Sequence, residues 1–255
     1  MANSLDPTQR FSTRVENYVK YRPTYPPAVL TTLEAYCQLT PDSPIADVGS
    51  GTGILTQLFL DHGNPVYAVE PNAPMRQAAE SRLAHRPNFY SVDGRAEATA
   101  LPDASVDFVT AGQAFHWFDR EAARREFCRI LRPEGYVMLV WNDRCSDTPF
   151  LADYEQLLQR YGIGYTEVFR RFFERDNLAQ FYGSNRFTLA TLNHSQIFDY
   201  EGLSGVMLSS SYTPEADHPD YQSMLDNLAN IFEAHSVNGQ VAIEYTTRMY
   251  YGQLT

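Results

Sequence analysis

The residues best suited to chemistry in this chain form a glycine-rich stretch at positions 44–53, Pro-Ile-Ala-Asp-Val-Gly-Ser-Gly-Thr-Gly. Its three glycines, Gly49, Gly51 and Gly53, leave a backbone with no side chains to keep a ligand away. A helix that follows this turn directs its free N–H groups and its positive end toward the ligand, which favours an anionic group. Glu70 closes the next apolar run, where a carboxylate suits a ribose diol.

The spacing of the glycines separates two classes of nucleotide cofactor. A dinucleotide fold requires Gly-x-Gly-x-x-Gly, and its third glycine would fall at position 54, which is Ile54. The chain has Gly49-x-Gly51-x-Gly53 instead, with Asp47 two residues before it. This disfavours a nicotinamide-dependent dehydrogenase. A glycine turn alone is a weak signal, and the alternative is a left-handed turn that serves folding alone.

Short apolar runs alternate with helical patterns between residues 44 and 142, as a parallel sheet with crossover helices requires. Strands are predicted over 45–48, 66–70, 88–93, 106–111 and 136–141, and helices over 52–61, 73–84 and 120–131. Asp119 is the predicted N-cap of the third helix, which should end at Arg132-Pro133-Glu134-Gly135.

The chain is predicted to be a single domain, 1–255, with a cofactor-binding core over 41–143. Residues 1–40 read as an N-terminal helical cap, and 148–183, rich in aromatic residues, as a helical insertion after the fifth strand. The remaining sheet and helices occupy 187–255, with strands over 187–200 and 241–250 and a helix over 221–235.

Several segments together resemble a known family. The turn with Asp47 resembles the first motif of class I S-adenosylmethionine-dependent methyltransferases. Residues 93–97 and 101–107 look like the adenine-side loop and fourth strand of the type-11 methyltransferase family. Leu131-Arg132-Pro133-Glu134-Gly135 is similar to that family's Leu-x-Pro-Gly-Gly turn, with Glu134 in place of the first glycine.

Two further motifs are similar to a subgroup of trans-aconitate methyltransferase-like proteins. They are Gln113-Ala114-Phe115-His116-Trp117-Phe118-Asp119 and the N-terminal Tyr18-x-x-Tyr21-Arg22-Pro23-x-Tyr25-Pro26. The resemblance implies an α/β, Rossmann-like fold with a mostly parallel seven-stranded sheet flanked by helices. It implies S-adenosyl-L-methionine as the cofactor and a small-molecule substrate.

The resemblance also implies a set of site residues. Those that match cofactor-binding positions of the family are Tyr21, Asp47, Gly49, Ser50, Gly51, Gly53, Glu70, Pro71, Asn72, Met75, Ala96, Glu97, Gln113 and Ala114. Arg95 stands where many relatives carry an acid, and it cannot accept a hydrogen bond from adenine. Adenine recognition then falls to the backbone around Ala96 and to Glu97.

Other candidates have a plain structural alternative. His116 is the candidate catalytic base, and the alternative is a packed histidine between Phe115 and Trp117. Arg22 and Trp117 are expected to bind the substrate, whereas Tyr21 and Arg22 could equally pack the N-terminal cap. Met75, expected against adenine, could be an ordinary core methionine.

Composition excludes several function classes. The net charge of −11 argues against nucleic acid or an anionic membrane as a partner. The three cysteines form no Cys-x-x-Cys pair, and the six histidines show no metal-binding spacing, so no metal is expected. No apolar run approaches the roughly 18 residues of a membrane span, and the first residues lack a signal-peptide pattern. A soluble, cytoplasmic protein is predicted.

The favoured function is methyl transfer to a small organic molecule. The resemblance to the trans-aconitate subgroup favours a carboxylate oxygen as the acceptor, and Arg22 or Arg14 could hold it. The alternative is a sensor or scaffold that binds S-adenosylmethionine without transferring methyl. The sequence leaves the acceptor, the need for a general base and the oligomeric state open.

Overall fold

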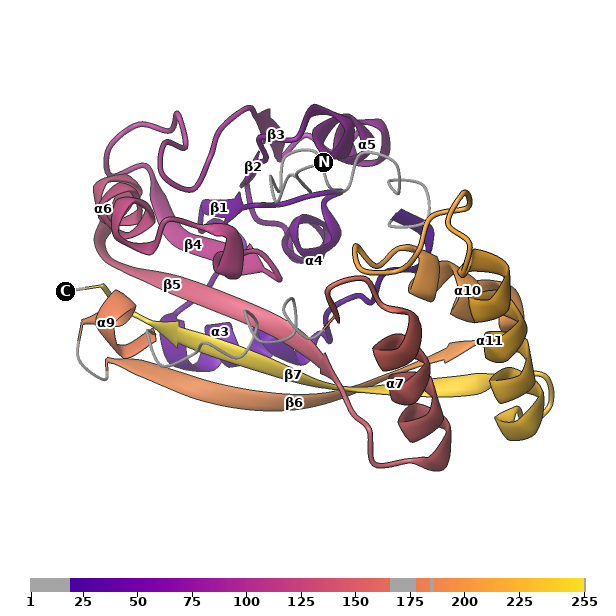
Figure 1. Cartoon of the computed structure of the whole chain (residues 1–255). Coiled ribbons are helices and arrows are strands. Elements are labelled where there is room, and N and C mark those ends of the chain that lie inside the picture. The colour runs from indigo at the N-terminus through magenta and orange to yellow at the C-terminus, as the bar shows by residue number, and fades with distance from the viewer. Residues whose placement is uncertain (1–18, 166–177, 184–185, 255) are drawn as a thin grey trace.

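The computed structural model describes residues 19–165, 178–183 and 186–254 (Figure 1). Seven strands form one sheet in the order β3-β2-β1-β4-β5-β7-β6. They are β1 (Ile45–Val48), β2 (Val66–Val69), β3 (Phe89–Val92), β4 (Val106–Gly112), β5 (Leu131–Arg144), β6 (Phe187–Phe198) and β7 (Val241–Gly252). Strands β1 to β5 pair in parallel, and β7 is antiparallel to both of its neighbours. The predicted mostly parallel, seven-stranded sheet is confirmed.

Helices cover both faces of the parallel strands. The helices are α3 (Ala28–Cys37), α4 (Ile54–His62), α5 (Ala73–Leu83), the short 3₁₀ helix η1 (Phe115–Trp117), α6 (Arg120–Ile130), α7 (Pro149–Tyr161), α9 (Leu178–Tyr182), α10 (Tyr200–Leu208) and α11 (Tyr221–His235). Alternating side chains of β5 enter opposite cores: Val137 and Leu139 pack with α6 and α9, and Met138 packs with α3 and α4. Burial on both faces explains why these strands read as continuous apolar runs.

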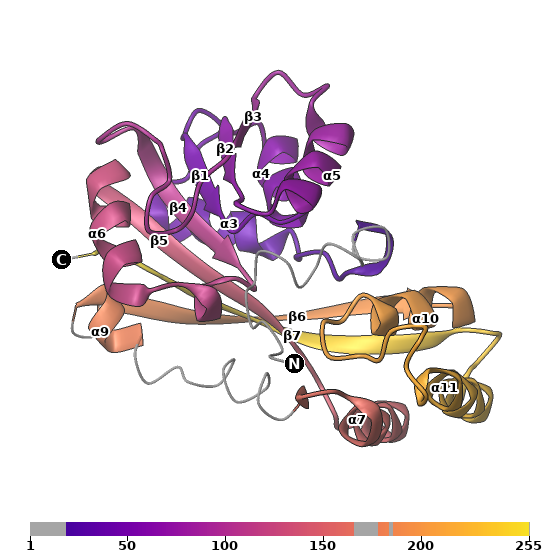
Figure 2. The same cartoon turned by 45° about the horizontal axis from the view of Figure 1, so that its top comes forward.

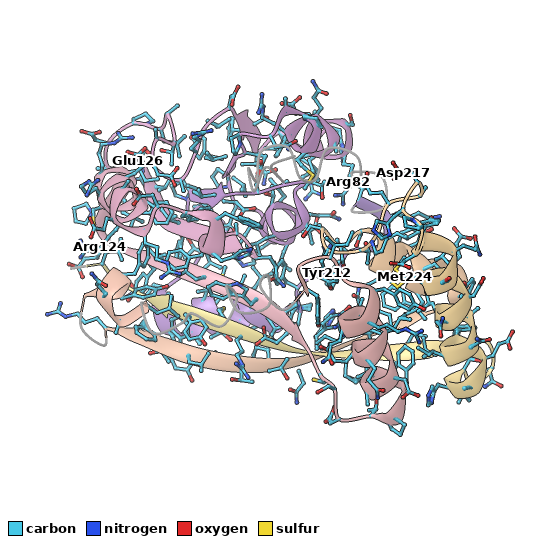
Figure 3. All side chains as sticks on the ribbon, viewed as in Figure 1. Arg82, Arg124, Glu126, Tyr212, Asp217 and Met224 are labelled. Carbon is cyan, nitrogen blue, oxygen red and sulfur yellow. The ribbon has the colours of Figure 1, made fainter. Side chains whose placement is uncertain are left out.

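Strands β5, β6 and β7 extend beyond β1 to β4, and a third core forms around their extended ends (Figure 2). Their distal halves lie with α7, α10 and α11, whose apolar faces pack together. Met224 of α11 is buried in this core, and Tyr212 stands edge-to-face with Tyr165 at 4.8 Å between ring centroids (Figure 3). Arg144, at the end of β5, pairs with Glu155 of α7 at 2.7 Å. These strands therefore join the parallel half to the distal helices.

Two predicted boundaries were wrong. Helix α6 ends at Ile130, and β5 begins at Leu131 rather than at Tyr136, because Leu131 pairs with Val106 before a register shift brings Tyr136 opposite Phe108. The predicted strand over 187–200 ends at Phe198, since Asp199 accepts a hydrogen bond from Gly202 N and caps the unpredicted helix α10.

The two predicted helical additions are described in part. The predicted cap, 1–40, includes α3, but residues 1–18, with Arg14 and Tyr18, lie outside the described residues. The predicted insertion, 148–183, includes α7 and α9, and its residues 166–177 lie outside them. Within the described part of the chain, no helix has the length and apolarity needed to cross a bilayer.

The turn after β1 requires glycine at position 53. Gly53 has φ +81°, and a Cβ there would meet Leu83 Cδ1 of α5 at 2.6 Å. We expect Gly53→Ala to lower the free energy of unfolding by about 3 kcal/mol, from left-handed strain of about 1–2 kcal/mol and overpacking of about 1–3 kcal/mol. Urea unfolding measures the loss.

Gly239→Ala is the matched control. Gly239 has φ +72°, and nothing lies within 4 Å of the position that a Cβ would take, so this variant carries the backbone strain without the clash. A loss of about 1–2 kcal/mol is expected there. Equal losses at both positions would contradict the packing of the turn against α5.

Candidate functional site

The candidate site is a cleft at the carboxyl ends of β1, β2 and β4, where the strand order reverses between β1 and β4. Open α/β sheets bind ligands at such a switch point. The cleft has a volume of ≈ 710 Å³, within the range of small-molecule sites. It is lined by Gly49, Gly51, Glu70, Pro71, Asn72, Met75, Arg95, Ala96, Glu97, Ala98, Gly112, Gln113, Ala114, Trp117, Phe118 and Asp119.

The glycine turn brings bare backbone to the floor of this cleft. Gly49 and Gly51 have φ values of +69° and +57°, which favour glycine. A Cβ on Gly49 would lie 2.6 Å from Ala114 Cβ, so the turn is pressed against the end of β4. Gly53, also predicted to bind the cofactor, does not line the cleft; it begins α4 and packs against α5.

Glu70 links the end of β2 to the glycine turn. Its Oε2 accepts from Gly51 N at 2.9 Å, and its Oε1 accepts from Asn72 N at 2.8 Å. Burial raises the pKa of this carboxyl, while the two backbone donors and the nearby Arg76 guanidinium lower it. The carboxylate is thereby held in one orientation at the cleft wall, and each oxygen has a second lone pair to offer.

Helix α5 supplies the next part of the wall. Asn72 caps it through a hydrogen bond from Met75 N to Oδ1 at 3.0 Å. This cap places Met75 against the glycine turn. Its Cε lies 3.3 Å from the position that a Cβ on Gly51 would take. Met75 is 4% exposed and lines the cleft, so it is a buried residue that also reaches the cleft wall.

The loop after β3 forms the opposite side. Arg95 and Ala98 exchange two backbone hydrogen bonds, each of 3.0 Å, which turn Ala96 and Glu97 toward the cleft. Glu97 Oε1 accepts from Asp119 N at 2.8 Å and so joins the loop to the start of α6. This leaves Ala96, at 4% exposure, as an apolar surface on which a flat ring can lie.

The end of β4 closes the cleft. Gln113 has φ +55°, a conformation that is costly outside glycine and is common at functional sites. Its Nε2 donates to Asn142 O at 3.2 Å. Trp117 lines the cleft, and the His116 ring lies beside it at 4.8 Å between centroids. His116 is not among the lining residues of this cleft.

A narrow pocket of ≈ 40 Å³ adjoins the cleft and shares Gly49, Gly112 and Gln113 with it. The other residues around it are Arg22, Pro23, Tyr25, Asp47, Ser50, Ile54, Leu55 and Asn142. Arg22 reaches it from the segment before α3 and donates through Nη2 to Ser209 O at 3.1 Å. The lining of the pocket therefore includes both a cation and the glycine turn.

Tyr21, predicted to bind the cofactor, lies elsewhere. Its hydroxyl donates to Glu201 Oε1 at 2.8 Å, and its ring covers Gly205 of α10. Tyr21 lines neither cavity. In this position it packs the segment before α3 onto the distal helices.

Asp47 is fully buried below the glycine turn. Its Oδ2 accepts from the Thr56 hydroxyl at 2.6 Å, and its Oδ1 accepts from the Thr110 hydroxyl at 3.1 Å. Burial raises the pKa of Asp47 from 3.8 to about 6, although both hydroxyls lower it. Its carboxyl thus ties the turn to α4 and β4 and faces the narrow pocket from below.

Most predicted cofactor residues share the two cavities, and the sequence missed some of their neighbours. Among those missed, Tyr25 and Asn142 line the narrow pocket. Tyr25 lies in the N-terminal Tyr-Pro motif, which was a signal that could have identified it, and Asn142 ends the apolar run of β5. In the described part of the chain, no group of three metal-ligating side chains is placed to hold a metal ion.

Comparison with known proteins agrees with this geometry. A family model described as a methyltransferase domain, of type 11, matches residues 46–139. An uncharacterized methyltransferase of Schizosaccharomyces pombe is 31% identical over 202 residues, which cover 79% of this chain and 78% of that protein. A second protein of that yeast, named as methyltransferase-like, is 28% identical over 97% of this chain and 96% of its own length.

Solved structures share the fold. One from Anaeromyxobacter dehalogenans, named as a type II methyltransferase, has a TM-score of 0.66 and 23% identity over 91% of this chain and 98% of its own. Another, an S-adenosylmethionine-dependent methyltransferase from Geobacter sulfurreducens in complex with S-adenosyl-L-homocysteine, has a TM-score of 0.52 and 16% identity over 95% of this chain and 98% of its own.

The raised pKa of Asp47 predicts a pH dependence of stability. The folded protein keeps this proton up to about pH 6, whereas the unfolded chain releases it near the ordinary value of 3.8. The free energy of unfolding should therefore fall by roughly 3 kcal/mol in total as the pH rises from about 3 to about 7. Asp47→Asn has no proton to lose and should remove this part of the slope.

Urea unfolding of the ligand-free protein at several pH values measures the effect. Burial also raises the pKa of Glu70, which is present in both proteins, so this burial contribution cancels in the comparison. The Glu70 charge also raises the pKa of Asp47, and that interaction is part of the effect assigned to Asp47. If Asp47→Asn kept the wild-type slope, the assignment to Asp47 would be wrong.

Proposed function

This chain belongs to the methyltransferase family, and from that premise we propose that it transfers the methyl group of S-adenosylmethionine to a carboxylate oxygen of a small organic acid. The observation that carries the proposal is the continuous cleft of ≈ 710 Å³ in which the glycine turn, Glu70 and the loop around Ala96 meet. A nucleoside with a charged tail needs these three surfaces: bare backbone, a diol acceptor and an apolar ring platform.

The nucleoside occupies the wide cleft. Both Glu70 oxygens keep a lone pair for the ribose hydroxyls, because one backbone N–H donates to each of them. Adenine lies between Met75 and Ala96, which are both apolar at the cleft surface. Arg95 offers donors and no acceptor, so the adenine amino group is left to backbone carbonyls and Glu97.

The methionine group occupies the narrow pocket. Arg22 was expected to bind the substrate, but its position beside Ser50 and the glycine turn favours the carboxylate of the cofactor. Asp47, below the same pocket, favours the ammonium group. The sulfonium then lies near Gln113, which lines both cavities, and the acceptor approaches along Trp117.

The chemistry requires close placement more than acid–base groups. The acceptor oxygen attacks the methyl carbon, the carbon–sulfur bond breaks, and its electron pair stays on sulfur, leaving S-adenosylhomocysteine and a methyl ester. Holding the reactants in line can lower the barrier by roughly 7–11 kcal/mol. A carboxylate acceptor has no proton to remove at neutral pH.

The cleft supports an acceptor of this kind because its own carboxylates are already engaged. Glu97 accepts from Asp119 N, Asp119 accepts from Ala122 N, and Glu70 accepts from two backbone donors. Asp47 is held by two hydroxyls. A hydroxyl or amine acceptor would benefit from a base, whereas a carboxylate acceptor can be methylated while these groups keep their hydrogen bonds.

The binding roles of Glu70 and Arg22 predict different ligand profiles. Glu70→Gln should raise the Kd of S-adenosylmethionine by about 30-fold or more, because two hydrogen bonds to a charged acceptor are weakened. It should weaken 5′-methylthioadenosine, which has the ribose and lacks the amino acid group, equally. Arg22→Ala should raise the Kd of S-adenosylmethionine by about tenfold or more and leave that of methylthioadenosine unchanged.

Isothermal titration without acceptor gives both affinities. Glu34→Gln is the control, since Glu34 pairs with His62 and lines neither cavity. An unchanged Kd of S-adenosylmethionine in Arg22→Ala would show that Arg22 does not bind the cofactor, and would favour its predicted role in binding the acceptor. No binding to the wild-type protein at millimolar ligand would refute the proposal as a whole.

Methyl transfer is tested with methyl-labelled S-adenosylmethionine and a panel of small acids, alcohols and amines. We expect labelled methyl ester from an acid, with release of S-adenosylhomocysteine. Tight cofactor binding without turnover of any panel member would favour the alternative, a sensor or scaffold. Turnover of alcohols or amines in preference to acids would exclude the carboxylate acceptor.

His116→Gln separates the acceptor classes further. With a carboxylate acceptor, kcat should stay within about fivefold of wild type, because no proton is removed. A loss of about 10²–10⁴ would identify His116 as a general base and point to a hydroxyl or amine. Trp117→Phe, which changes the neighbouring cleft wall, is the control for an indirect effect on ring packing.

A further inference from the structure

Strand β6 is a long edge strand with no charged residue. It runs twelve residues, Phe-Thr-Leu-Ala-Thr-Leu-Asn-His-Ser-Gln-Ile-Phe, and contains no lysine, arginine, acid, proline or glycine. Burial lowers the pKa of His194, which keeps its ring neutral at physiological pH. Exposed edge strands are normally shortened, charged or interrupted by proline, since their free N–H and C=O groups pair with other strands.

Among the described residues, β6 pairs with β7 alone, so no described strand pairs with its outer backbone edge (Figure 1). The opposite edge strand, β3, has four residues. The protection that is usual at a sheet edge is therefore present on the β3 side and absent on the β6 side.

The exposed side chains of β6 are complementary to a second copy of the same strand. Leu189 is 46% exposed and Ile197 is 64% exposed, and both lie on one face of the strand. An antiparallel self-pairing centred on Asn193 places each Leu189 opposite Ile197 of the partner subunit. It also places Thr191 opposite Ser195 of the partner subunit, and each Asn193 opposite its copy.

Charges on the neighbouring strand fit the same centre. Arg248 of β7 lies opposite Thr191, and Glu244 lies opposite Ser195. A two-fold axis through Asn193 therefore puts Arg248 and Glu244 of the partner subunit in the same cross-strand row. Two such rows are related by the axis, and in each row the two paired β6 strands separate the opposite charges, which lie about 14 Å apart.

Net charge favours this edge over other surfaces for self-association. Two copies of a chain with net charge −11 repel each other, and the repulsion is least where the contact itself carries no charge. Exposed aromatic side chains flank the strand: Tyr36 of α3 is 69% exposed beside Thr188, and Tyr200 is 37% exposed beyond Phe198. Self-pairing brings Thr188 opposite Phe198 of the partner subunit, and so places Tyr36 near the end of the partner's β6 strand.

We propose that two copies of this protein associate through antiparallel pairing of their β6 strands about a two-fold axis at Asn193, which joins their sheets into one. Main-chain hydrogen bonds give the pairing its direction, and the Leu189 and Ile197 side chains fix its register. The dimer leaves the cleft of each copy intact, because no β6 residue lines it.

The test uses opposite charges at position 193. Asn193→Lys and Asn193→Glu each place like charges face to face across the axis, so each variant alone should raise the dimer dissociation constant at least about tenfold. An equal mixture of the two variants places lysine opposite glutamate and should restore a dimer. Sedimentation velocity over a range of concentrations measures all four samples, with the wild type expected at twice 29.0 kDa.

Each outcome decides the proposal. A wild-type protein that stays monomeric, an Asn193→Lys protein that dimerises as well as wild type, or a mixture that stays monomeric would overturn it. Val237→Lys is the control for added charge: Val237 is 71% exposed in the turn before β7, and this variant should dimerise like the wild type.

Cross-linking checks the register independently. In this pairing the two Asn193 Cα atoms lie about 4.5–5.5 Å apart, within disulfide range, so Asn193→Cys should form a covalent dimer on mild oxidation. Leu189→Cys should not, because its two copies lie about 27 Å apart. Oxidised wild type controls for the natural thiols, of which Cys128 is exposed. Cross-linking of Leu189→Cys in preference to Asn193→Cys would refute the register.

Discussion

The whole site depends on how closely the turn after β1 approaches its two neighbouring strands. Gly51 N reaches the Glu70 carboxylate of β2 at 2.9 Å, while Gly49 leaves no room for a Cβ against Ala114 beyond β4. Both approaches need residues without side chains in left-handed conformations. Because parallel strands present their carboxyl ends at one edge, this single turn positions a diol acceptor, a bare backbone and an apolar wall around one cavity.

The electrostatics of the cleft follow from the same packing. Burial raises the pKa of both Asp47 and Glu70, and the Glu70 charge raises the pKa of Asp47 further. Their hydrogen-bond donors are hydroxyls and backbone N–H groups, which orient the carboxylates without a direct ion pair. Buried carboxylates held in this way create a negative potential suited to a sulfonium and an ammonium group.

The molecule has two parts, which differ in the length of their strands. The short parallel strands, β1 to β4, hold the cleft, whereas β5, β6 and β7 continue past it and pack with α7, α10 and α11 (Figure 2). Arg22 contacts both parts, since it lines the narrow pocket and donates to Ser209 after α10. The same length that carries the distal helices gives β6 its long open edge.

Sequence alone determined the parallel half and most of the cleft. Glycine spacing, Asp47 and the strand-terminal Glu70 are local signals, because a turn and the residue after a strand are fixed by neighbours in the chain. It could not place Tyr21 or Gly53, whose environments come from α10 and α5. Nor could it give the start of β5, which is set by pairing of Leu131 with Val106. These depend on contacts between segments far apart in the chain, and local pattern carries no information about which distant surface a side chain will meet.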